Sequence, residues 1–356
     1  MKIAVLFGGT SSERDVSIAS GSQVVKALRE AGHDVIAVDT ATGVLNEQDE
    51  KRLLNAGVAP APPDQATLGQ LSGTATTILQ SAALPEVDCI FLALHGGTGE
   101  NGTVQALLDL LGVPYAGSGL LGSAVAMDKE ISKRLFLAAG VPTPEWLMAP
   151  ATPLEVEEKI GWPAIVKPSK QGSTVGLSIV KKPEDLQRAI DEAFRHDDEV
   201  IIERFIPGRE LTVPILGSDP LPVGEIIVDR EIFDYETKYQ AGMAQEIFPA
   251  YLTDQQTMEV QALALKAHTA LKLGGYSRID FRLDPDGRFW CLEANTLPGM
   301  TAASLFPKGA AAAGMTFPEV CDRICQLAVE QFRTKRRIHA GTPGHAEPNL
   351  AERGPY

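Results

Sequence analysis

The sequence predicts an α/β protein with two or three domains. A chain of 356 residues is long for one hydrophobic core, and its apolar content of 44% is ordinary for a globular enzyme. An apolar strand at Ile3–Phe7, a helical pattern that closes at Gly32 and a second strand at Val35–Val38 form a βαβ unit. Much later, Ser277–Leu283 and Arg288–Asn295 follow a period of two around a turn, which predicts an antiparallel hairpin.

A glycine-rich loop follows the first strand. Residues 8–12 (GGTSS) precede the first helix, so backbone N–H groups and a helix N-terminus could face an anion. Glu13 and Arg14 would lie at the carboxyl edge of the sheet, where open α/β sheets bind ligands. Asp39 ends the next strand and could bind a ribose in a dinucleotide-dependent oxidoreductase, but the fingerprint GxGxxG is absent from this loop.

A second glycine-rich loop surrounds His95. Residues 40–85 have no clear period, and a strand at Cys89–Leu94 then leads into the sequence HGGTGENGT and a helix through Leu111. The glycines allow a ligand to approach the backbone closely, so His95 is either a ligand-binding residue or a structural hydrogen-bonding partner. The segment Tyr115–Gly119 is expected to be a domain boundary.

Two lysine-bearing segments predict a phosphate site. Asp128 caps a helix that ends at Gly140, and Lys129 in its first turn is poorly placed unless it reaches an anion. The strand Ala164–Lys167 is followed by a Gly/Ser/Thr loop with a further lysine and by a strand at Val175–Val180. Such a loop offers donors and positive charge to a triphosphate. The P-loop pattern GxxxxGK[ST] is absent, so a P-loop NTPase is excluded.

Strands at Glu199–Ile206 and Leu211–Leu216 are expected to flank an exposed bend. The carboxylates of Glu203 and Glu210 beside this bend could bind an adenine amino group and a ribose.

The remaining segments differ in their periodicity. Asp234–Phe248 has none and is expected to be a mobile loop, whereas Asp254–Leu273 and Pro318–Phe332 predict amphipathic helices. Arg333–Tyr356 is polar, basic and rich in Gly and Pro near its end, which predicts a disordered tail.

The hairpin predicts a metal site. Pairing Leu283 or Pro285 with Arg288 would set even-numbered residues of the first strand opposite odd-numbered residues of the second. The residues expected on one face are Arg278, Asp280, Arg282, Phe289, Cys291, Glu293 and Asn295. Oxygen donors without His or Cys suit Mg²⁺, which binds few carboxylates together with substrate phosphates. The tight loop Thr296–Thr301 directly follows, so we expect a metal and phosphate site here.

Charge and cysteine content exclude several classes of protein. The net charge of −14 argues against nucleic-acid and anionic-membrane partners. Four cysteines without a CxxC pair indicate neither zinc nor a disulfide framework. A polar, charged break interrupts the N-terminus after seven residues, and no apolar run reaches the ~18 residues of a membrane span. We therefore expect a soluble, cytoplasmic protein.

Taken together, these segments resemble those of the D-alanine–D-alanine ligases, which are members of the ATP-grasp superfamily. The segments that carry the resemblance are GGTSSERDVS, ALHGGTGENGT, YAGSG followed by MDK, IVKPSKQGSTVG, IIERFIPGRELTV, DYETKY, and SRIDF leading to LEANTLPGMTAASL. The resemblance implies an N-terminal α/β domain over residues 1–117 and two ATP-grasp lobes over residues 118–206 and 207–332, followed by the tail.

The resemblance also implies the reaction. ATP would phosphorylate one D-alanine to D-alanyl phosphate, a second D-alanine would attack, and ADP and phosphate would be released, giving a peptidoglycan precursor. A D-alanine–D-lactate ligase or another ATP-grasp carboxylate–amine ligase is the alternative within enzymes. A non-catalytic nucleotide-binding module is the alternative outside them. A homodimer is also expected.

The resemblance further implies residue roles. ATP would be bound by Lys129, Lys167, Ser173, Thr174, Glu203, Ile206, Glu210 and Lys238. Two Mg²⁺ ions, or Mn²⁺ in their place, would be held by Asp280, Glu293 and Asn295. The D-alanine substrates and the oxyanion would be bound by Glu13, His95, Arg278, Gly299, Ser304 and Leu305. Tyr239 would link the mobile loop to Ser173 and Glu13, so the residues expected to act in catalysis are Glu13, Ser173, Tyr239, Arg278 and Gly299.

Overall fold

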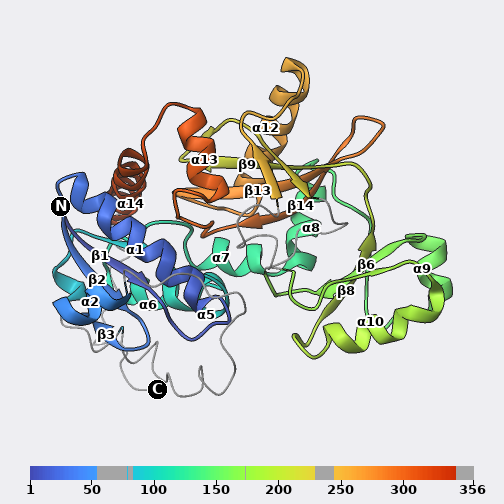
Figure 1. Cartoon of the computed structure of the whole chain (residues 1–356), viewed down its shortest axis with the longest axis horizontal. Helices are drawn as coiled ribbons and strands as arrows, with labels where there is room; N and C mark the ends of the chain where they lie inside the picture. The colour runs from blue at the N-terminus through green and yellow to red at the C-terminus, as the bar shows by residue number, and fades with distance from the viewer. Residues whose placement is uncertain (54–77, 79–82, 173, 229–243, 342–356) are drawn as a thin grey trace, which may run out of the picture.

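A computed structural model of the chain contains three β-sheets with helices packed around them (Figure 1). It describes residues 1–53, 78, 83–172, 174–228 and 244–341. The roles expected of Ser173, Lys238 and Tyr239 concern residues outside these ranges, as do most of residues 40–85 and the first part of the expected mobile loop.

The N-terminal sheet confirms the expected βαβ unit. Its strands, in the spatial order β3-β2-β1-β4, are β1 (Lys2–Phe7), β2 (Asp34–Asp39), β3 (Gly43–Val44) and β4 (Cys89–Leu92). β1 is parallel to both β2 and β4, and every residue from Ile3 to Phe7 is fully buried, which explains the continuous apolar run. The helices of this part are α1 (Arg14–Glu30), α2 (Glu47–Leu53), η1 (Leu84–Glu86), α5 (Gly97–Glu100) and α6 (Thr103–Leu111).

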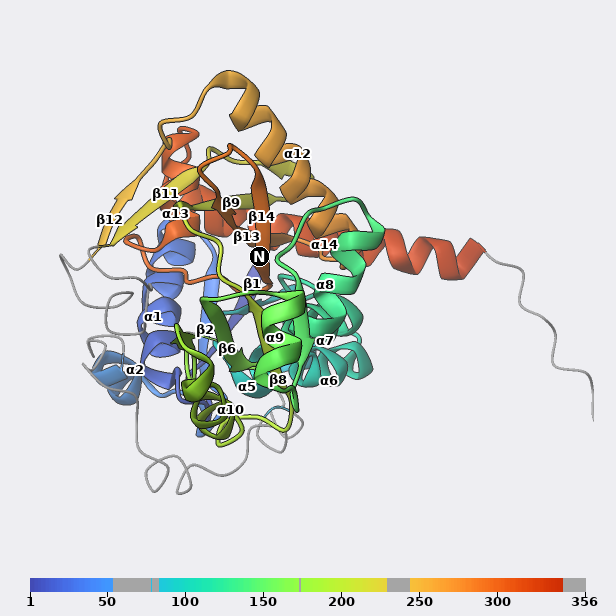
Figure 2. The ribbon, with the colours of Figure 1, turned by 90° about the vertical axis from the view of Figure 1, so that its right-hand side faces the viewer.

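The last helix, α14 (Phe317–Gly341), packs against the N-terminal part of the chain. Its buried residues Val320, Cys321, Ile324 and Cys325 share one core cluster with β1 and β4. The helix also continues nine residues beyond the expected end at Phe332, so the prediction of a disordered tail is wrong for residues 333–341. No Gly or Pro interrupts this stretch before Gly341, and basic side chains are favourable near a helix C-terminus. Its last turns project from the body in Figure 2.

The central sheet has four antiparallel strands. In the order β5-β8-β6-β7 they are β5 (Trp146–Met148), β8 (Val200–Arg204), β6 (Ala164–Pro168) and β7 (Ser178–Val180). The covering helices are α9 (Pro153–Lys159), η2 (Pro183–Asp185) and α10 (Leu186–Ala193). β7 is shorter than the expected strand Val175–Val180, because Thr174 and Gly176 have positive φ angles of 64° and 69° and form a turn.

The C-terminal sheet is the largest of the three. In the order β12-β11-β9-β13-β14, with β10 beside β9, its strands are β9 (Arg209–Leu216), β10 (Asp219–Pro220), β11 (Gly224–Val228), β12 (Ala244–Ile247), β13 (Tyr276–Leu283) and β14 (Phe289–Asn295). Helices α7 (Leu120–Met127), α8 (Lys129–Ala138) and α12 (Asp254–Ala270) share its core cluster, and α13 (Leu305–Ala312) also contacts β9.

The prediction of a mobile loop over Asp234–Phe248 is partly wrong. Residues Ala244–Ile247 pair with β11 as the edge strand β12. An edge strand needs a partner on only one side, so its mixed polar sequence gives no clean alternation. Within the described ranges, no helix is long and apolar enough to cross a membrane.

One extra residue in β14 sets the face of every side chain after it. Beyond the turn, Leu283 pairs with Phe289 and Phe281 with Cys291, whereas Asp280 pairs with Glu293, so Leu292 forms a β-bulge. The expected pairings of Arg288 with Leu283 or Pro285 are therefore wrong. So is the expectation that Phe289 and Cys291 lie on the site face, because both are buried in the core. The prediction that the remaining residues share one face is confirmed, since Asp280 lies opposite Glu293 and Arg278 lies opposite Asn295.

Candidate active site

A cavity of about 150 Å³ lies between the central and C-terminal sheets. Figure 2 shows β6 and β8 of the central sheet below β9, β13 and β14. The cavity is lined by Lys167 and Glu203 from the central sheet, by Gly172 and Thr174 from the loop after β6, and by Glu293 from β14. Most of the residues expected to bind ATP thus surround one space.

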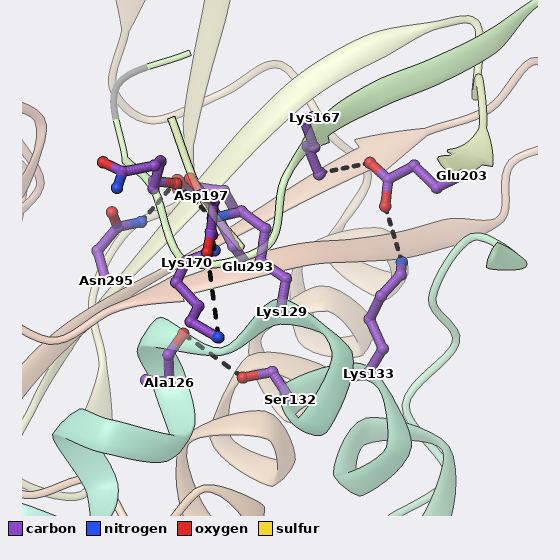
Figure 3. Close-up of polar contacts among 12 residues, drawn as sticks. Ala126, Lys129, Ser132, Lys133, Lys167, Lys170, Asp197, Glu203, Glu293 and Asn295 are labelled. Atoms are coloured by element: carbon purple, nitrogen blue, oxygen red, sulfur yellow. Dashed lines mark hydrogen bonds and ion pairs between the residues drawn. The ribbon is translucent and has the colours of Figure 1, made fainter. Parts of the chain in front are cut away.

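Glu203 lies between two lysines at one end of this cavity (Figure 3). Its Oε1 is 2.5 Å from Lys167 Nζ, and its Oε2 is 3.0 Å from Lys133 Nζ. Burial alone would raise the pKa of Glu203, but the two lysines outweigh it and lower the pKa to about 2. This carboxylate is therefore ionised at neutral pH and can accept a hydrogen bond from an amino group.

The neighbouring carboxylate, Glu210, is held by an arginine that the sequence reasoning did not assign. Arg282 Nη1 lies 3.2 Å from Glu210 Oε2, and the same guanidinium donates to the carbonyl oxygens of Ile206 and Gly208 at 3.1 and 2.8 Å. Arg282 thus fixes the bend after β8 against the end of β13. Its position two residues after Asp280 was the available signal, because the strand alternation puts both on one face.

Lys129 bridges the loop after β6 and the metal face. Its Nζ donates to the Gln171 carbonyl oxygen at 2.7 Å and lies 3.3 Å from Glu293 Oε2 (Figure 3). The unfavourable position of this lysine in the first turn of α8 is therefore offset by an anion and a carbonyl group. A triphosphate in the cavity could replace both partners.

The base of the loop after β6 is anchored to the turn before β8. The Lys170 backbone N–H donates to Asp197 Oδ2 at 2.5 Å, and Lys170 Nζ donates to Asp198 Oδ1 at 2.8 Å. Glu199 Oε2 lies 3.3 Å from the same ammonium group. Lys170 thus neutralises nearby acids, and its role is to hold the loop in place.

The metal face carries two carboxylates and one amide. Asp280 accepts hydrogen bonds from Thr212 Oγ1 at 2.7 Å, from the Arg278 guanidinium at 2.9 and 3.0 Å, and from Asn295 Nδ2 at 2.9 Å. Glu293 is its cross-strand neighbour. Among the described residues, no group of three or more His, Cys, Asp or Glu could hold a metal alone. Two carboxylates and an amide oxygen still fit Mg²⁺, because this ion takes further ligands from phosphate and water.

Glu13 lies where the glycine-rich loops meet. A Cβ on Gly96, whose φ is +67°, would be 2.7 Å from Glu13 Oε2, and one on Gly172 would be 3.6 Å away. Ser11 Oγ donates to the His95 carbonyl oxygen at 2.6 Å and joins the first two loops. The glycines therefore let the loop after β6 and the N-terminal sheet approach the buried carboxylate of Glu13.

His95 has the structural hydrogen bonds that the sequence left open. Its Nδ1 lies 3.1 Å from the Leu297 carbonyl oxygen, so Nδ1 carries the proton, and Nε2 can accept from the Ser20 hydroxyl at 2.9 Å. The Met300 backbone N–H donates to the same Ser20 oxygen at 3.3 Å. Burial lowers the pKa of His95, in agreement with a neutral ring. The histidine thus ties α1 to the loop that contains Gly299.

Gly299 and Ser304 lie together at the N-terminus of α13. A Cβ on Gly299 would be 2.9 Å from Ser304 Oγ, and that oxygen also accepts from the Thr301 backbone N–H at 3.2 Å. The Leu305 side chain points elsewhere, because it is buried with Ile226 in a separate small cluster.

Glu100 is a further acid that the sequence reasoning missed. It lines a smaller cavity with Glu293 and Asn295, and its Oε2 accepts from the Gly96 backbone N–H at 3.0 Å. Burial, with the charge of Glu13, raises the pKa of Glu100 to about 8. Glu100 is therefore protonated at pH 7. Its position five residues after His95 gave no periodic signal, because a glycine-rich loop lies between them.

Asp39 is excluded as a ribose-binding residue. Its carboxylate bonds the Arg14 guanidinium at 2.5 and 3.0 Å and accepts backbone N–H groups of Gly9 and Ala41 at 3.3 and 2.9 Å. It is fully buried, so no oxygen faces a ligand. Arg14 is turned toward Asp39 for the same reason. The alternative of a dinucleotide-dependent oxidoreductase loses its acidic residue.

Comparisons with known proteins agree with this arrangement. A family profile described as "D-ala D-ala ligase N-terminus" matches residues 2–118, and one described as "D-ala D-ala ligase C-terminus" matches residues 136–326. The chain is 40% identical over 339 residues to a D-alanine–D-alanine ligase of Halalkalibacterium halodurans, covering 93% of this chain and 100% of that protein.

Solved structures are similar over nearly the whole chain. A D-alanine–D-alanine ligase of Bacillus anthracis complexed with ATP has 32% identity and a TM-score of 0.75, covering 94% of this chain and 99% of the other. The VanG D-Ala:D-Ser ligase of Enterococcus faecalis has 28% identity and a TM-score of 0.74, with coverage of 92% and 99%.

Proposed function

The chain belongs to the D-alanine–D-alanine ligase family, and on that premise we propose that it joins two D-alanine molecules at the expense of ATP, producing a peptidoglycan precursor. It is an ATP-dependent carboxylate–amine ligase with an ATP-grasp fold. The observation that carries the proposal is the cavity between two sheets, which is lined by Lys129, Lys167, Gly172 and Glu293. Gly172 also lies next to the carboxylate of Glu13, so the cavity and the N-terminal sheet meet there.

The reaction follows from charge. A carboxylate is a poor electrophile, so the γ-phosphoryl group of ATP is first transferred to it, and Lys129 and Lys167 offset the negative charge of the phosphates. Both lysines are already held at the cavity by carboxylates, which they exchange for phosphate. The transfer gives ADP and an acyl phosphate, which is an activated acyl donor.

Asp280, Glu293 and Asn295 are proposed to hold Mg²⁺. The ion would neutralise phosphate charge and orient the triphosphate when bound. The residues fit it, since two carboxylates and one amide oxygen on one face leave other positions to substrate oxygens.

The second step needs an amine, an oxyanion site and a leaving phosphate. The second D-alanine loses a proton from its ammonium group, and the resulting amine attacks the acyl carbonyl carbon. The C–O bond to phosphate then breaks, and phosphate leaves as HPO4²⁻ with the second proton lost by the nitrogen. Arg278 and the Gly299 backbone N–H are proposed to bind the oxyanion. Glu13 would bind the ammonium group of the first D-alanine. Ser304 and the backbone of Leu305 would bind the carboxylate of the second, because the N-terminus of α13 favours an anion.

The roles expected of Ser173, Lys238 and Tyr239 stay predictions. The acyl phosphate hydrolyses in water, so a lid must close over it, and the segment around Lys238 and Tyr239 is the proposed lid.

The test is ATP-dependent phosphate release with a panel of D- and L-amino acids, including D-serine, and with D-lactate. Product analysis accompanies it with D-alanine and D-lactate supplied together near pH 7. We expect release only with D-amino acids, and D-alanyl-D-alanine as the dominant product. Equal or dominant D-alanyl-D-lactate would replace the proposed second substrate, and no release with any D-amino acid would reject the function.

We also propose a homodimer and a cytoplasmic location. The exposed fractions of Leu110, Leu120 and Leu121 are 84%, 44% and 57%, and these leucines belong to the neighbouring helices α6 and α7. A cytoplasmic location follows from the need for ATP. Light scattering of the purified protein and of a Leu110→Glu, Leu121→Glu variant tests the dimer, which the variant should dissociate.

The proposed domain boundaries are residues 1–117, 118–206 and 207–316. In this proposal α14 returns to the N-terminal domain, because its buried face lies in that core.

A further inference from the structure

Lys133 is a fully buried cation beside the proposed adenine pocket. It lies one turn after Lys129 on α8, and its side chain is 1% exposed. It does not line the cavity, so it cannot bind the nucleotide directly. A buried ammonium group is costly unless it is paired and hydrogen-bonded, and its position therefore needs a reason.

The partners of Lys133 come from both sides of the ATP cleft, and Figure 3 shows its ion pair with Glu203. Its Nζ lies 3.0 Å from Glu203 Oε2 in the central sheet and 5.4 Å from the centre of the Trp146 ring. It also donates to Thr143 Oγ1 at 2.8 Å, and Thr143 donates to the Cys291 carbonyl oxygen at 2.8 Å. Cys291 directly precedes the bulge at Leu292, so Lys133 connects Glu203 to the strand that carries the metal face.

Glu203, Lys133 and Lys167 together carry a net positive charge, which is removed when one lysine turns to another anion. Without a nucleotide, Lys133 and Lys167 both pair with the single carboxylate of Glu203. Lys167 lines the cavity and can turn to an anion, whereas Lys133 is enclosed. A buried carboxylate must keep one cation, since removing its last partner is strongly unfavourable. Lys133 supplies that cation when Lys167 turns away.

We propose that Lys133 is a positioning residue for ATP, which keeps Glu203 fixed and compensated so that Lys167 is released to the phosphates while Glu203 accepts the adenine amino group. The inference rests on the proposed ATP site. Glu203 Oε2 is buried against Lys133, whereas Oε1 pairs with Lys167, so Oε1 becomes available to accept an N–H from adenine when Lys167 turns to the phosphates. The lowered pKa of Glu203, about 2, agrees with a carboxylate that stays ionised.

The first experiment compares Lys133→Met with Arg134→Met. Methionine keeps an unbranched side chain without the charge, and Arg134 is the next residue on α8, with a side chain that is 68% exposed. Calorimetric Kd values for ATP with Mg²⁺, KM values for ATP and D-alanine, and thermal melting are measured on the full chain. For Lys133→Met we expect the Kd and KM for ATP to rise at least about tenfold, or about 1.4 kcal/mol. The KM for D-alanine should stay within about twofold, and Arg134→Met should match the unchanged protein in every readout.

The second experiment adds Glu203→Gln to Lys133→Met. Without the carboxylate, Lys167 has no anion to hold it, so the double variant should bind ATP more tightly than Lys133→Met alone, by about threefold or more. The double variant also removes the uncompensated buried charge, so it serves as the test if Lys133→Met fails to fold. ATP binding by the double variant that equals or falls below that of Lys133→Met would overturn the proposal, as would Lys133→Met with unchanged ATP binding. If Lys133→Met does not fold, the unchanged protein is the reference, and a double variant that folds with a Kd for ATP more than about tenfold higher is the overturning result.

Glu203→Gln alone separates this inference from the ATP site on which it rests. A carboxylate accepts from the amino group of adenine and repels the carbonyl oxygen that guanine has there, so the preference for ATP over GTP should fall. An unchanged preference would reject Glu203 as the adenine contact, whatever Lys133→Met shows. A fallen preference with unchanged ATP binding in Lys133→Met would reject only the role of Lys133.

Discussion

The two ends of the ATP cleft hold their charges in different ways. At the adenine end, Lys133 and Glu203 have side chains that are 1% and 4% exposed, and a second lysine completes the cluster. At the metal end, the side chain of Glu293 is 28% exposed and pairs with Lys129 at 3.3 Å, and Asp280 pairs with Arg278. The Lys129, Asp280 and Arg278 side chains are 8%, 10% and 14% exposed, so Glu293 is the most exposed charge of the two pairs at the metal end.

The difference shows which charges are fixed before the nucleotide arrives. Separating the enclosed pair of Lys133 and Glu203 would leave an unpaired buried charge, at a cost of about 3–5 kcal/mol, so this pair is fixed in advance while Lys167 can turn to the phosphates. Glu293 is less desolvated than Glu203, so phosphate and a divalent cation can replace its pairing with Lys129 at a lower cost. Carboxylates released from Lys129 and Arg278 would then become available to the proposed metal ion.

The largest expected effect is at the metal end. Glu293→Gln keeps the shape of the side chain and should preserve the fold, but it should lower turnover by at least about 100-fold, because a neutral amide binds Mg²⁺ poorly. Phosphate release at increasing Mg²⁺ concentration measures it. Asp286→Asn, an exposed acid in the turn of the same hairpin, is the matched control. Near-normal turnover of folded Glu293→Gln at saturating Mg²⁺ would remove Glu293 from the metal site.

The adenine end should show itself in acid. The pKa of Glu203 is lowered to about 2 from a model-compound value of 4.5, so its stabilisation is complete above about pH 4.5 and is lost as the pH falls toward 2. The loss amounts to up to about 3 kcal/mol. Urea unfolding at several pH values should give a steeper decline for the unchanged protein than for Glu203→Gln. Parallel curves would mean that the two lysines do not hold the carboxylate ionised.

Near the metal end, Glu100 should make stability depend on pH in the opposite direction. Its pKa is raised to about 8, so folding favours the protonated acid, and stability falls as the pH rises from about 4.5 through 8. Glu100→Gln should remove this decline and stabilise the protein by about 2 kcal/mol at pH 8, after allowance for partial solvent exposure. Thermal melting from pH 5 to pH 9 measures it. A decline that persists unchanged in the variant would assign the titration to another group.

The smallest effect is expected far from both ends. Truncation after Phe332 should change the melting temperature by less than about 2 °C and leave turnover unchanged, because residues 333–335 are exposed and cover no core. A larger fall would show that the end of α14 stabilises the N-terminal core on which the helix packs. A matching truncation after Gly341 separates the helical residues from those that follow.

The sequence predicted those parts of the site that depend on local alternation. The βαβ unit was predicted from a continuous apolar strand. Asp280, Glu293 and Asn295 were placed together from the period of two, but in a wrong register, and it is the bulge at Leu292 that brings them together. The same alternation placed Arg282 on the face of Asp280, but gave no role for it. Lys133 could not be found in this way, because its partners Glu203 and Thr143 become neighbours only when α8 packs against the C-terminal sheet and the Lys133 side chain reaches the central sheet.

Long-range packing also explains the remaining errors. Helix α14 buries its apolar face against β4, more than 200 residues earlier in the chain, and nothing local identifies that partner. Strand β12 depends on β11 across residues outside the described ranges. Whether His95 binds a ligand or holds the loop was also undecidable, since Leu297 lies 202 positions away.

Leu292 divides β14 into two segments that evolution or a protein designer can change separately. Between the turn and Leu292, Phe289 and Cys291 must stay apolar to fill the core; after Leu292, Glu293 and Asn295 must stay polar. A residue added to the turn leaves both patterns intact. A residue added after Leu292 would turn Glu293 and Asn295 to the opposite face of the strand and direct a carboxylate into the hydrophobic core. Straightening the strand into a regular ladder, a usual step toward greater stability, would therefore abolish the activity.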